Sequence, residues 1–366
     1  MRHILRYLTS GESHGPALTA ILEGMPAGVN IDLNFINNEM KRRQVGYGRG
    51  GRMKIESDTV KILSGIRFSK TLGSPISLMI ENSDFANWTE KMMQFGIPNT
   101  EVNPITVPRP GHADYSGMIK YKTNDLRNIL ERASARETAA KVAIGAICKQ
   151  YLSLHNVKIF SHTVSIKNIM ANKNSIDYND VEKIIESNDL RCVDETVLED
   201  MRNLIDEAKE NGDTLGGISE VITIGMPTGI GSFMHSDRRL DALIAGELMS
   251  VPSVKGIEIG AGFLGTENMG STFHDQIYKS GRTSNNAGGI EGGITNGEPI
   301  VIRAAIKPIP TLKKPLNTVD IVSGEEVKAH SERSDVCVVP AAGVVLEAAL
   351  AFVLANAILS DNIDAI

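Results

Sequence analysis

The sequence predicts an α+β fold in which helices cover antiparallel sheets, organised as one domain over residues 1–366. Three observations support this prediction. Predicted strands and helices alternate irregularly and do not follow the strand–helix–strand order of a doubly wound sheet. The chain begins with a hairpin-like pair of strands, and no linker or low-complexity segment divides it.

The predicted N-terminal hairpin presents a histidine. Strands are predicted at 5–9 and 17–23, and the tight turn at 10–15 places His14 beside small residues and a glycine. Such a histidine is positioned to reach a ligand, although a lone turn histidine is more often a surface residue. An amphipathic helix is predicted at 32–43. Its predicted apolar face consists of Leu33, Ile36 and Met40.

This helix leads into a basic, glycine-rich stretch. Residues 41–52 contain five cations, four glycines and no acid. Unpaired cations repel one another unless an anion joins them, and glycine lets a ligand approach the backbone. A solvated basic loop is the alternative interpretation. Because the whole chain carries 44 acidic against 38 basic side chains, we interpret the stretch as a site for a small, highly charged anion.

A second histidine lies in a stiff turn. Strands predicted at 60–64 and 75–80 precede a long irregular segment, 83–107, which holds the only tryptophan, Trp88. Loops of this length are usually functional or mobile. The turn that follows has the sequence Pro-Arg-Pro-Gly-His-Ala-Asp, in which prolines and a glycine stiffen the backbone around His112. Such a turn could also serve structure alone.

The rest of the chain supplies the longest predicted helix and further strands. The helix covers 125–154, and its small, basic early part would let a planar ligand or another helix lie close. Residues 265–297 are rich in Gly, Ser, Thr and Asn and could cradle phosphate, but they match neither a P-loop nor a dinucleotide fingerprint. Other strands are predicted at 157–165, 219–225, 254–260 and 299–305, and other helices at 177–186, at 195–211, from a cap at Ser236 or Asp237 to 249, and at 341–359.

Composition narrows the functional class. The net charge of −6 argues against nucleic acid or an anionic membrane as the main partner. The three cysteines contain no CxxC pair and give neither a disulfide framework nor a zinc site. We see no signal peptide, and no stretch that approaches the ~20 apolar residues of a membrane span. We therefore expect a soluble cytoplasmic protein without a metal site.

Five motifs resemble those of chorismate synthase. They are Gly-Glu-Ser-His-Gly at 11–15, Arg-Arg-Gln with Gly-Tyr-Gly-Arg over 42–49, Arg-Pro-Gly-His-Ala-Asp at 109–114, Ser-Ala-Arg-Glu-Thr at 134–138 and Arg-Ser-Asp at 333–335. Their order and spacing match from the first strand to the last helix. The resemblance implies trans-1,4-elimination of phosphate from 5-enolpyruvylshikimate 3-phosphate, with reduced FMN required and no net redox change. It also implies a β-α-β sandwich that assembles as a homotetramer.

The resemblance also assigns roles to single residues. His14 resembles the histidine that protonates the flavin near N1, and His112 the one that protonates the departing phosphate. Asp335 resembles the acid that helps remove the ring proton together with the flavin N5. Arg43 and Arg49 match positions that bind substrate anions or NADP, so their ligand, and NADPH as a source of reducing equivalents, stay open. The flavin-contacting positions are Arg132, Ala133, Ser134, Gly292, Lys307, Pro308, Ile309, Pro310, Thr311 and Arg333.

The physical chemistry of these residue types agrees with that reaction. The substrate carries two carboxylates and a phosphate, and arginine forks bind both groups in bidentate fashion. One position departs from the family, because many members have Asn-Ala where this chain has Pro252-Ser253. Proline lacks the N–H and the amide side chain, so a flavin contact at Pro252 must use the backbone carbonyl or packing.

Two other functions fit part of the sequence. An NADPH-dependent flavin oxidoreductase would share FMN and the arginines, and it would turn over NADPH without the shikimate-pathway substrate. A non-catalytic anion- or RNA-binding module would explain the basic stretch alone. It would leave the two positioned histidines and the acidic total unexplained.

Overall fold

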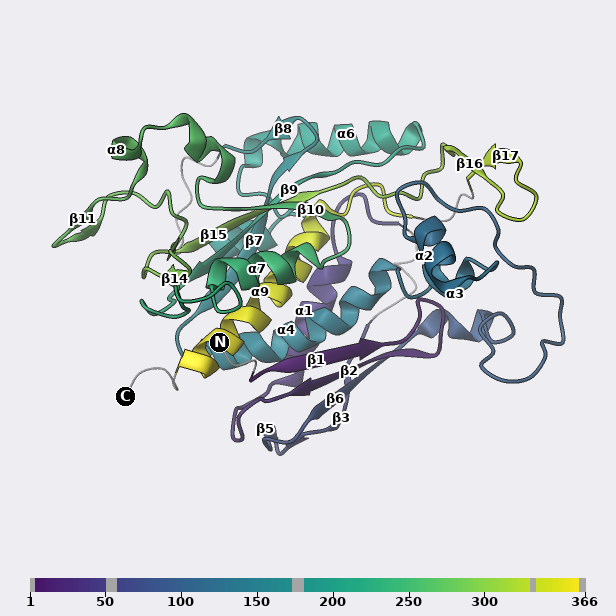
Figure 1. Ribbon diagram of the computed structural model, residues 1–366, viewed down its shortest axis with the longest axis horizontal. Coiled ribbons are helices and arrows are strands. Elements are labelled where there is room, and N and C mark those ends of the chain that lie inside the picture. The colour runs from purple at the N-terminus through teal and green to yellow at the C-terminus, as the bar shows by residue number, and fades with distance from the viewer. Residues whose placement is uncertain (1–3, 51–57, 173–180, 330–333, 362–366) are drawn as a thin grey trace.

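Two antiparallel sheets enclose a layer of helices, so the molecule is a β-α-β sandwich (Figure 1). This computed structural model describes residues 4–50, 58–172, 181–329 and 334–361, and it confirms the predicted α+β class. The first sheet has the strand order β1 (Arg6–Ser10), β2 (Ala17–Glu23), β6 (Ile76–Glu81) and β3 (Lys61–Ser64). The second has the order β10 (Val254–Ile259), β15 (Ile300–Ile306), β9 (Gly217–Ile224), β7 (Lys158–Ile166) and β8 (Ile169–Met170).

The helical layer consists of α1 (Leu33–Gln44), α4 (Thr138–Ser153) and α9 (Val339–Asp361), with α7 (Leu240–Met249) packed against α9. Helix α4 lies on the first sheet through β2 and β6, and α9 lies on the second through β7 and β9. Because its two sides meet α4 and a sheet, α9 is apolar all round, as a fully buried helix must be.

Helix α9 corrects one expectation from the sequence. By length and composition it could cross a membrane, since its most apolar stretch has a mean hydropathy of 2.1. The prediction that no stretch approaches that length was therefore wrong. The same stretch is 89% buried inside the protein, which is the pattern of a core helix.

Three predicted helices begin or continue differently. The long helix predicted at 125–154 is interrupted at Ser134, whose backbone is extended. The Ser134 side chain accepts the backbone N–H of Arg136 and so caps a separate short helix, η3 (Ala135–Glu137), which precedes α4. Asp32 caps α1 by accepting the N–H of Asn34 at 2.8 Å, and Leu33 is 42% exposed, so it does not belong to the buried face. The N-cap position of α7 is Arg239, beyond both Ser236 and Asp237, and the Arg239 side chain makes no capping hydrogen bond.

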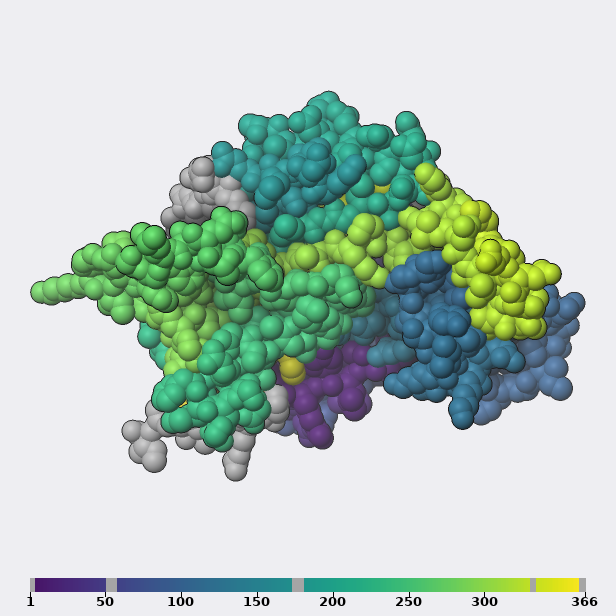
Figure 2. All heavy atoms as spheres, turned by 45° about the horizontal axis from the view of Figure 1, so that its top comes forward, coloured from purple at the N-terminus to yellow at the C-terminus, as the bar shows by residue number. Residues whose placement is uncertain are grey.

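The remaining elements lie around these layers, and α6 (Leu198–Glu210) is the longest of them. Figure 2 shows the segment with α8 (Gly270–Phe273) and β11 (Ile277–Tyr278) as a green arm that extends from the body. The N-terminal part of the helix predicted at 177–186 lies outside the described residues. The short elements are β4 (Ile66–Arg67), β5 (Lys70–Thr71), η2 (Ser83–Asn87), α2 (Asp114–Tyr121), α3 (Arg127–Leu130), α5 (Val181–Glu186), η4 (Glu195–Val197), η5 (Gly262–Glu267), β12 (Gly281–Arg282), β13 (Ile290–Glu291), β14 (Ile294–Thr295), β16 (Asn317–Val319) and β17 (Glu326–Lys328).

Candidate active site

A cavity of about 390 Å³ lies where the C-terminal end of α1 meets the N-terminal ends of α4 and α9. The turn after β1, the turn before α2 and the segment after β15 complete its wall. Part of the wall is small and apolar, with Ala133, Ala341 and Ala342. The charged and titratable residues of the lining are His14, Arg43, Arg49, Arg109, His112, Arg136, Lys307 and Asp335.

Most of the predicted site residues line this single cavity. These are His14, Arg43, Arg49, His112, Ala133, Ser134, Pro252, Ser253, Lys307, Ile309, Pro310, Thr311 and Asp335. They come from segments as far apart in sequence as the first hairpin and the residues before α9. The backbone of Ser253 takes the left-handed conformation (φ 75°), and its carbonyl accepts the N–H of Lys307 at 2.9 Å, which joins two parts of the wall.

Four predicted residues are not part of the described lining. Pro308 faces a separate cavity of about 550 Å³ beside α6 and β9. The guanidinium of Arg132 donates to the carbonyl and hydroxyl oxygens of Thr9 at 3.0 and 2.7 Å. Gly292 lies in the β13–β14 hairpin next to α7, and Figure 1 places β14 at the opposite end of the molecule from α2 and α3. Arg333 lies outside the described residues.

The arginines of the basic stretch are paired with carboxylates from elsewhere in the chain. The expectation of unpaired cations is therefore wrong for Arg42, Arg43 and Arg49, although Gly51 and Arg52 lie outside the described residues. Arg43 donates to Asp58 at 2.5 Å, and Arg136 donates to both oxygens of Asp58 at 2.7 and 2.6 Å. One buried carboxylate thus holds two arginines at the cavity.

Arg43 and Arg136 together carry two positive charges against the single negative charge of Asp58, so one positive charge remains for a ligand. Within the described residues, Arg43 Nε is buried without a hydrogen-bond partner. Burial lowers the pKa of Arg43 to about 10, and the charges of Arg49 and Arg136 act in the same direction while Asp58 opposes them. An anion in the cavity would relieve this repulsion and fill the missing hydrogen bond.

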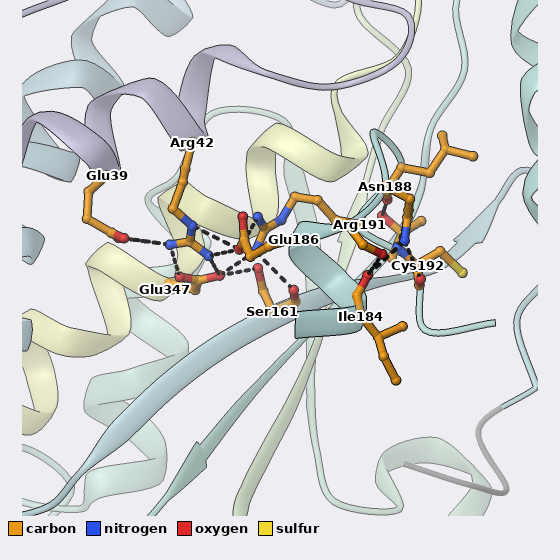
Figure 3. A network of polar contacts seen from close by, with 12 residues as sticks. Glu39, Arg42, Ser161, Ile184, Glu186, Asn188, Arg191, Cys192 and Glu347 are labelled. Carbon is orange, nitrogen blue, oxygen red and sulfur yellow. Dashed lines mark hydrogen bonds and ion pairs between the residues drawn. The ribbon is translucent and has the colours of Figure 1, made fainter. Parts of the chain in front are cut away.

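Arg42 enters a buried charge cluster, which we define as Glu39, Arg42, Lys149, Glu186, Arg191 and Glu347. Figure 3 labels all of them except Lys149, and Glu186, whose side chain is 38% exposed, forms the outer edge of the cluster. Arg42 donates to Glu347 at 2.8 Å and to Glu186 at 2.7 Å. Lys149 of α4 donates to the same Glu347 at 2.5 Å. Burial acts to raise the pKa of Glu347, but the charges of Arg42, Lys149 and Arg191 outweigh burial and hold it below its ordinary value. The cluster fixes the end of α1 against α4 and α9.

Arg49 and Asp335 form an ion pair at the cavity mouth. Arg49 Nη1 donates to Asp335 Oδ2 at 2.7 Å, and the backbone N–H of Gly50 donates to Oδ1 at 2.5 Å. Gly48 allows this approach, because its φ is +85° and an added Cβ would lie 3.1 Å from the backbone nitrogen of Cys337. The glycines therefore bring the basic stretch against the segment before α9.

His112 is fixed by a carboxylate. Its Nδ1 lies 2.5 Å from Asp114 Oδ1, and Arg109 Nε donates to Asp114 Oδ2 at 2.9 Å. Burial raises the pKa of Asp114, but the hydrogen bonds from His112 and Arg109 outweigh burial and lower it to about 2. Asp114 is therefore ionised near neutral pH, and it leaves Nε2 of His112, which has Arg109 Nη2 3.5 Å away, as the ring nitrogen for a ligand. Lys307 Nζ donates to the carbonyl of Gly111 at 2.5 Å, which ties this turn to the end of β15.

His14 is fixed in the same manner by a different element. Its Nδ1 lies 2.9 Å from Glu131 Oε1, and its backbone N–H donates to Glu131 Oε2 at 2.8 Å. Asn82 holds the turn that contains His14, because its side-chain amide nitrogen donates to the carbonyl oxygen of Gly15 at 2.7 Å. Asn82 also accepts from Arg136 Nε at 2.9 Å, so the histidine turn and the arginine pair share one support.

Some of the remaining site residues could be recognised from the sequence. Arg109, Asp114 and Arg136 lie within motifs that were already singled out, next to residues with assigned roles. Asp58 and Glu131 were missed. Asp58 has no motif around it, and Glu131 directly precedes the predicted flavin-contacting segment at Arg132 but has no local link to His14. Only the fold brings Asp58 to Arg136, 78 positions away, and Glu131 to His14, 117 positions away.

The cavity and the fold define a class of protein, namely an enzyme that binds a small, multiply charged anion beside two histidines held by carboxylates. Such a site suits acid–base chemistry at a phosphate ester. The family model of chorismate synthase matches residues 5–359. The chain is similar to chorismate synthase of Aquifex aeolicus, with 55% identity over 97% of this chain and 92% of that protein.

A second relative and a solved structure agree with this match. The chain is 52% identical to chorismate synthase of Caldicellulosiruptor bescii, over 97% of this chain and 94% of that protein. A crystal structure of chorismate synthase superimposes with a TM-score of 0.77 at 43% identity, over 98% of this chain and 92% of that one. The chain belongs to the chorismate synthase family. It is a phosphate-eliminating lyase that converts 5-enolpyruvylshikimate 3-phosphate to chorismate in the shikimate pathway.

Proposed function

We propose that His14, His112 and Asp335 are the catalytic residues of this lyase and that Arg43 and Arg49 bind substrate anions. The observation that carries the proposal is that the two histidines, each held at Nδ1 by a buried carboxylate, line the same cavity as these arginines and Asp335. Arg109 and Arg136 line it too, so carboxylates and phosphate of one substrate have bidentate partners within reach.

The residues fit the flavin that the family uses. Reduced FMN carries an anionic phosphate and a tricyclic ring, and the cavity offers a buried Arg43 Nε without a partner within the described residues as well as a small apolar wall. Ala133, Ser134 and the segment 309–311 would hold the group, and Pro252 would contact it through packing or its carbonyl. When bound, the reduced flavin would supply an electron-rich ring, and its N5 would share with Asp335 the removal of the single proton that the substrate ring loses.

The protein's own groups supply the proton transfers. Asp114 orients His112 so that Nε2 can give a proton to the phosphate oxygen as the carbon–oxygen bond breaks, which lowers the charge on the leaving group. Asp335 can accept a proton from the substrate ring, and its pairing with Arg49 and Gly50 fixes where that acceptor lies. His14 Nε2 holds a proton near the flavin. Each such group typically contributes about 10²–10⁴-fold to the rate.

The test uses alanine variants of both histidines under anaerobic conditions with reduced FMN and substrate, and chorismate absorbance as the readout. His14→Ala and His112→Ala should each lose turnover by about 10²-fold or more. His14→Ala alone should shift the absorbance of bound reduced FMN toward its anionic form at a given pH. Full turnover in either variant would remove that residue from the mechanism, and identical flavin spectra in both would overturn the division of roles.

NADPH is proposed only as a possible source of electrons for the flavin, through Arg43 or Arg49. The measurement is NADPH oxidation by the purified protein with oxidised FMN and no shikimate-pathway substrate. Oxidation at a rate that matches chorismate formation would support self-reduction. A flavin oxidoreductase that lacks lyase activity would instead oxidise NADPH and form no chorismate.

We further propose that the chain acts as one domain, 1–366, in a cytoplasmic homotetramer. Large apolar side chains support an assembly, since Phe263, Met269 and Ile277 on and beside the arm are 78%, 80% and 73% exposed. A contact between Gly292 and a flavin would also require another copy, given the position of β14 in Figure 1. Sedimentation velocity of the purified protein tests this, and a monomer at micromolar concentration would contradict it.

A further inference from the structure

The only tryptophan of the chain lies against His14. The rings of Trp88 and His14 are stacked, with centroids 3.9 Å apart and planes inclined by 27°. The guanidinium carbon of Arg127 and the Nζ of Lys91 each lie 5.1 Å from the Trp88 ring centroid. Trp88 belongs to the segment that the sequence marks as a long irregular loop, and the reaction described so far gives it no task.

Glu131 holds the His14 turn at both backbone and side chain. Its carboxylate accepts the backbone N–H of His14 at 2.8 Å and lies 2.9 Å from the ring Nδ1, and its carbonyl accepts the N–H of Ser13 at 3.0 Å. Arg127 donates to the same carboxylate at 3.0 Å. The Glu131 side chain is only 2% exposed. Burial acts to raise the pKa of Glu131, but its bonds with His14 hold it below the ordinary value, so the carboxylate stays charged.

We propose that Glu131 and Trp88 are positioning residues for His14. Glu131 binds Nδ1 of His14, so that Nε2 is the ring nitrogen directed to the cavity. The Trp88 ring covers one face of the imidazole and prevents the ring from rotating. This inference rests on the proposed role of His14. Its physical basis is that a carboxylate at one ring nitrogen stabilises the cationic, doubly protonated imidazole and fixes its orientation.

Other charged groups also face His14. On the elements packed against it these are Glu131, Arg127 and, across Trp88, Lys91. Across the cavity lie Arg43, Arg49, Arg109, Arg136, Lys307, His112 and Asp335. The Glu131 carboxylate is the anion in contact with the ring, and its removal should make protonation of His14 harder.

The first test reads the His14 charge without any catalysis. All tryptophan fluorescence of the chain comes from Trp88, and a cationic imidazole stacked on an indole quenches it more strongly than a neutral one. We expect the wild-type emission to fall as the pH is lowered, and His14→Asn to abolish that transition. In Glu131→Gln the transition should move to lower pH, because the carboxylate that stabilises the cationic ring is gone.

The chain offers a matched control in a second buried histidine–glutamate pair. His162 Nε2 lies 3.1 Å from Glu220 Oε1 in the second sheet, and both side chains are buried. Glu220→Gln removes the same charge from the same kind of pair, away from the cavity lining. In Glu220→Gln the fluorescence transition of Trp88 should occur at the same pH as in the wild type. A wild-type transition in Glu131→Gln would overturn the proposal.

The second test is kinetic and separates the two proposals. Glu131→Gln should lower kcat by about tenfold or more with little change in KM, and the alkaline limb of its kcat profile should move to lower pH. In a His14→Ala background, Glu131→Gln should lower kcat no further, because Glu131 acts through His14. If the two substitutions lower kcat additively, the positioning role of Glu131 is wrong. Full activity of His14→Ala would overturn the proposed function of His14, while a shifted fluorescence transition would still support the positioning.

A further variant covers the case in which Glu131→Gln does not fold, which far-UV circular dichroism would reveal. Glu131→Asp keeps the charge but shortens the side chain by one methylene. We expect it to keep a fluorescence transition close to the wild type while kcat falls, because the charge remains and the geometry is lost. A kcat equal to that of the wild type would contradict the requirement for position.

Discussion

Arg42 and Arg43 are adjacent in sequence but serve different parts of the molecule. Successive residues of a helix point about 100° apart, so one side chain enters the buried charge cluster while the next reaches the cavity. The sequence shows only two cations at the end of a helix. Which of them meets the ligand depends on where Glu347 and Asp58 lie, and both come from other segments.

At the residue scale, Arg49→Ala should weaken binding of 5-enolpyruvylshikimate 3-phosphate about ten- to a hundredfold. The loss of one partly buried, charge-assisted partner typically costs about 1.5–3 kcal/mol. Isothermal titration in the presence of reduced FMN measures the affinity, and high salt should reproduce part of the loss. Arg6→Ala is the control, because Arg6 also pairs with a carboxylate, that of Glu23, but its side chain is 77% exposed. Unchanged affinity in Arg49→Ala would mean that the ion pair with Asp335 has a structural role only.

The two histidine turns show how much of the site the sequence could predict. Gly-Glu-Ser-His-Gly and Pro-Gly-His are local signals, because glycine and proline dictate the turn within a few residues. The carboxylates that orient the rings differ in this respect. Asp114 is two positions from His112 and was visible, whereas Glu131 is 117 positions from His14 and depends on the fold.

At the element scale, the crossing of α4 and α9 depends on a glycine. A Cβ added to Gly145 would lie 2.3 Å from the Cβ and 2.4 Å from the Cα of Ala348, so the two helices touch through their backbones. This close approach places the N-terminal ends of both helices at the cavity. Small residues along the 125–154 pattern indicated a contact of this kind, but the Ser134 cap that splits the pattern is set by one side chain and was not predicted.

Gly145→Ala should therefore destabilise the protein by about 1–3 kcal/mol through overpacking. Gly246 of α7 provides the matched control, because a Cβ added there meets nothing within 4 Å. Gly246→Ala should stabilise by about 0.5–1 kcal/mol, since alanine is the better helix former. Urea midpoints of the two variants should move in opposite directions. Equal shifts would show that helix propensity, and not the crossing, decides the outcome.

Glu347→Gln should be more damaging than either glycine variant. The glutamate is fully buried and accepts from Arg42, Lys149 and Arg191, so its neutralisation leaves excess positive charge in the core. Removal of one partner of a buried pair typically costs about 3–5 kcal/mol. Chemical denaturation measures the loss. Asp241→Asn, at an exposed ion pair with Arg239, should leave the midpoint almost unchanged, and a similar effect of both variants would contradict this account.

At the scale of the whole molecule, the depressed carboxylate pKa values predict loss of stability in acid. The pKa of Asp114 is about 2 in the folded protein and that of Glu347 is also lowered, whereas unfolded side chains titrate near about 4. The unfolded state then binds more protons, so this stability is complete above about pH 5 and falls as the pH drops from about 4 toward about 2.

The measurement is the urea midpoint between pH 7 and pH 3. The wild type should lose stability steeply below about pH 4, and Asp114→Asn should show a shallower decline because one depressed group is gone. Glu81→Gln, whose carboxylate is exposed beside Lys61, should follow the wild-type slope. Parallel curves for Asp114→Asn and the wild type would contradict the assigned pKa.

The buried charge cluster has a consequence for how this chain can diverge. Its members are three carboxylates (Glu39, Glu186, Glu347) and three cations (Arg42, Lys149, Arg191), so the formal charges cancel. A lineage that neutralises Glu39, Lys149, Arg191 or Glu347 alone leaves an uncompensated charge in the interior, whereas Glu186 is 38% exposed and can be lost at lower cost. At the four buried positions we expect descendants to keep the sign of the charge or to change two members of opposite sign together, so substitutions in α1, α4 and α9 should be correlated.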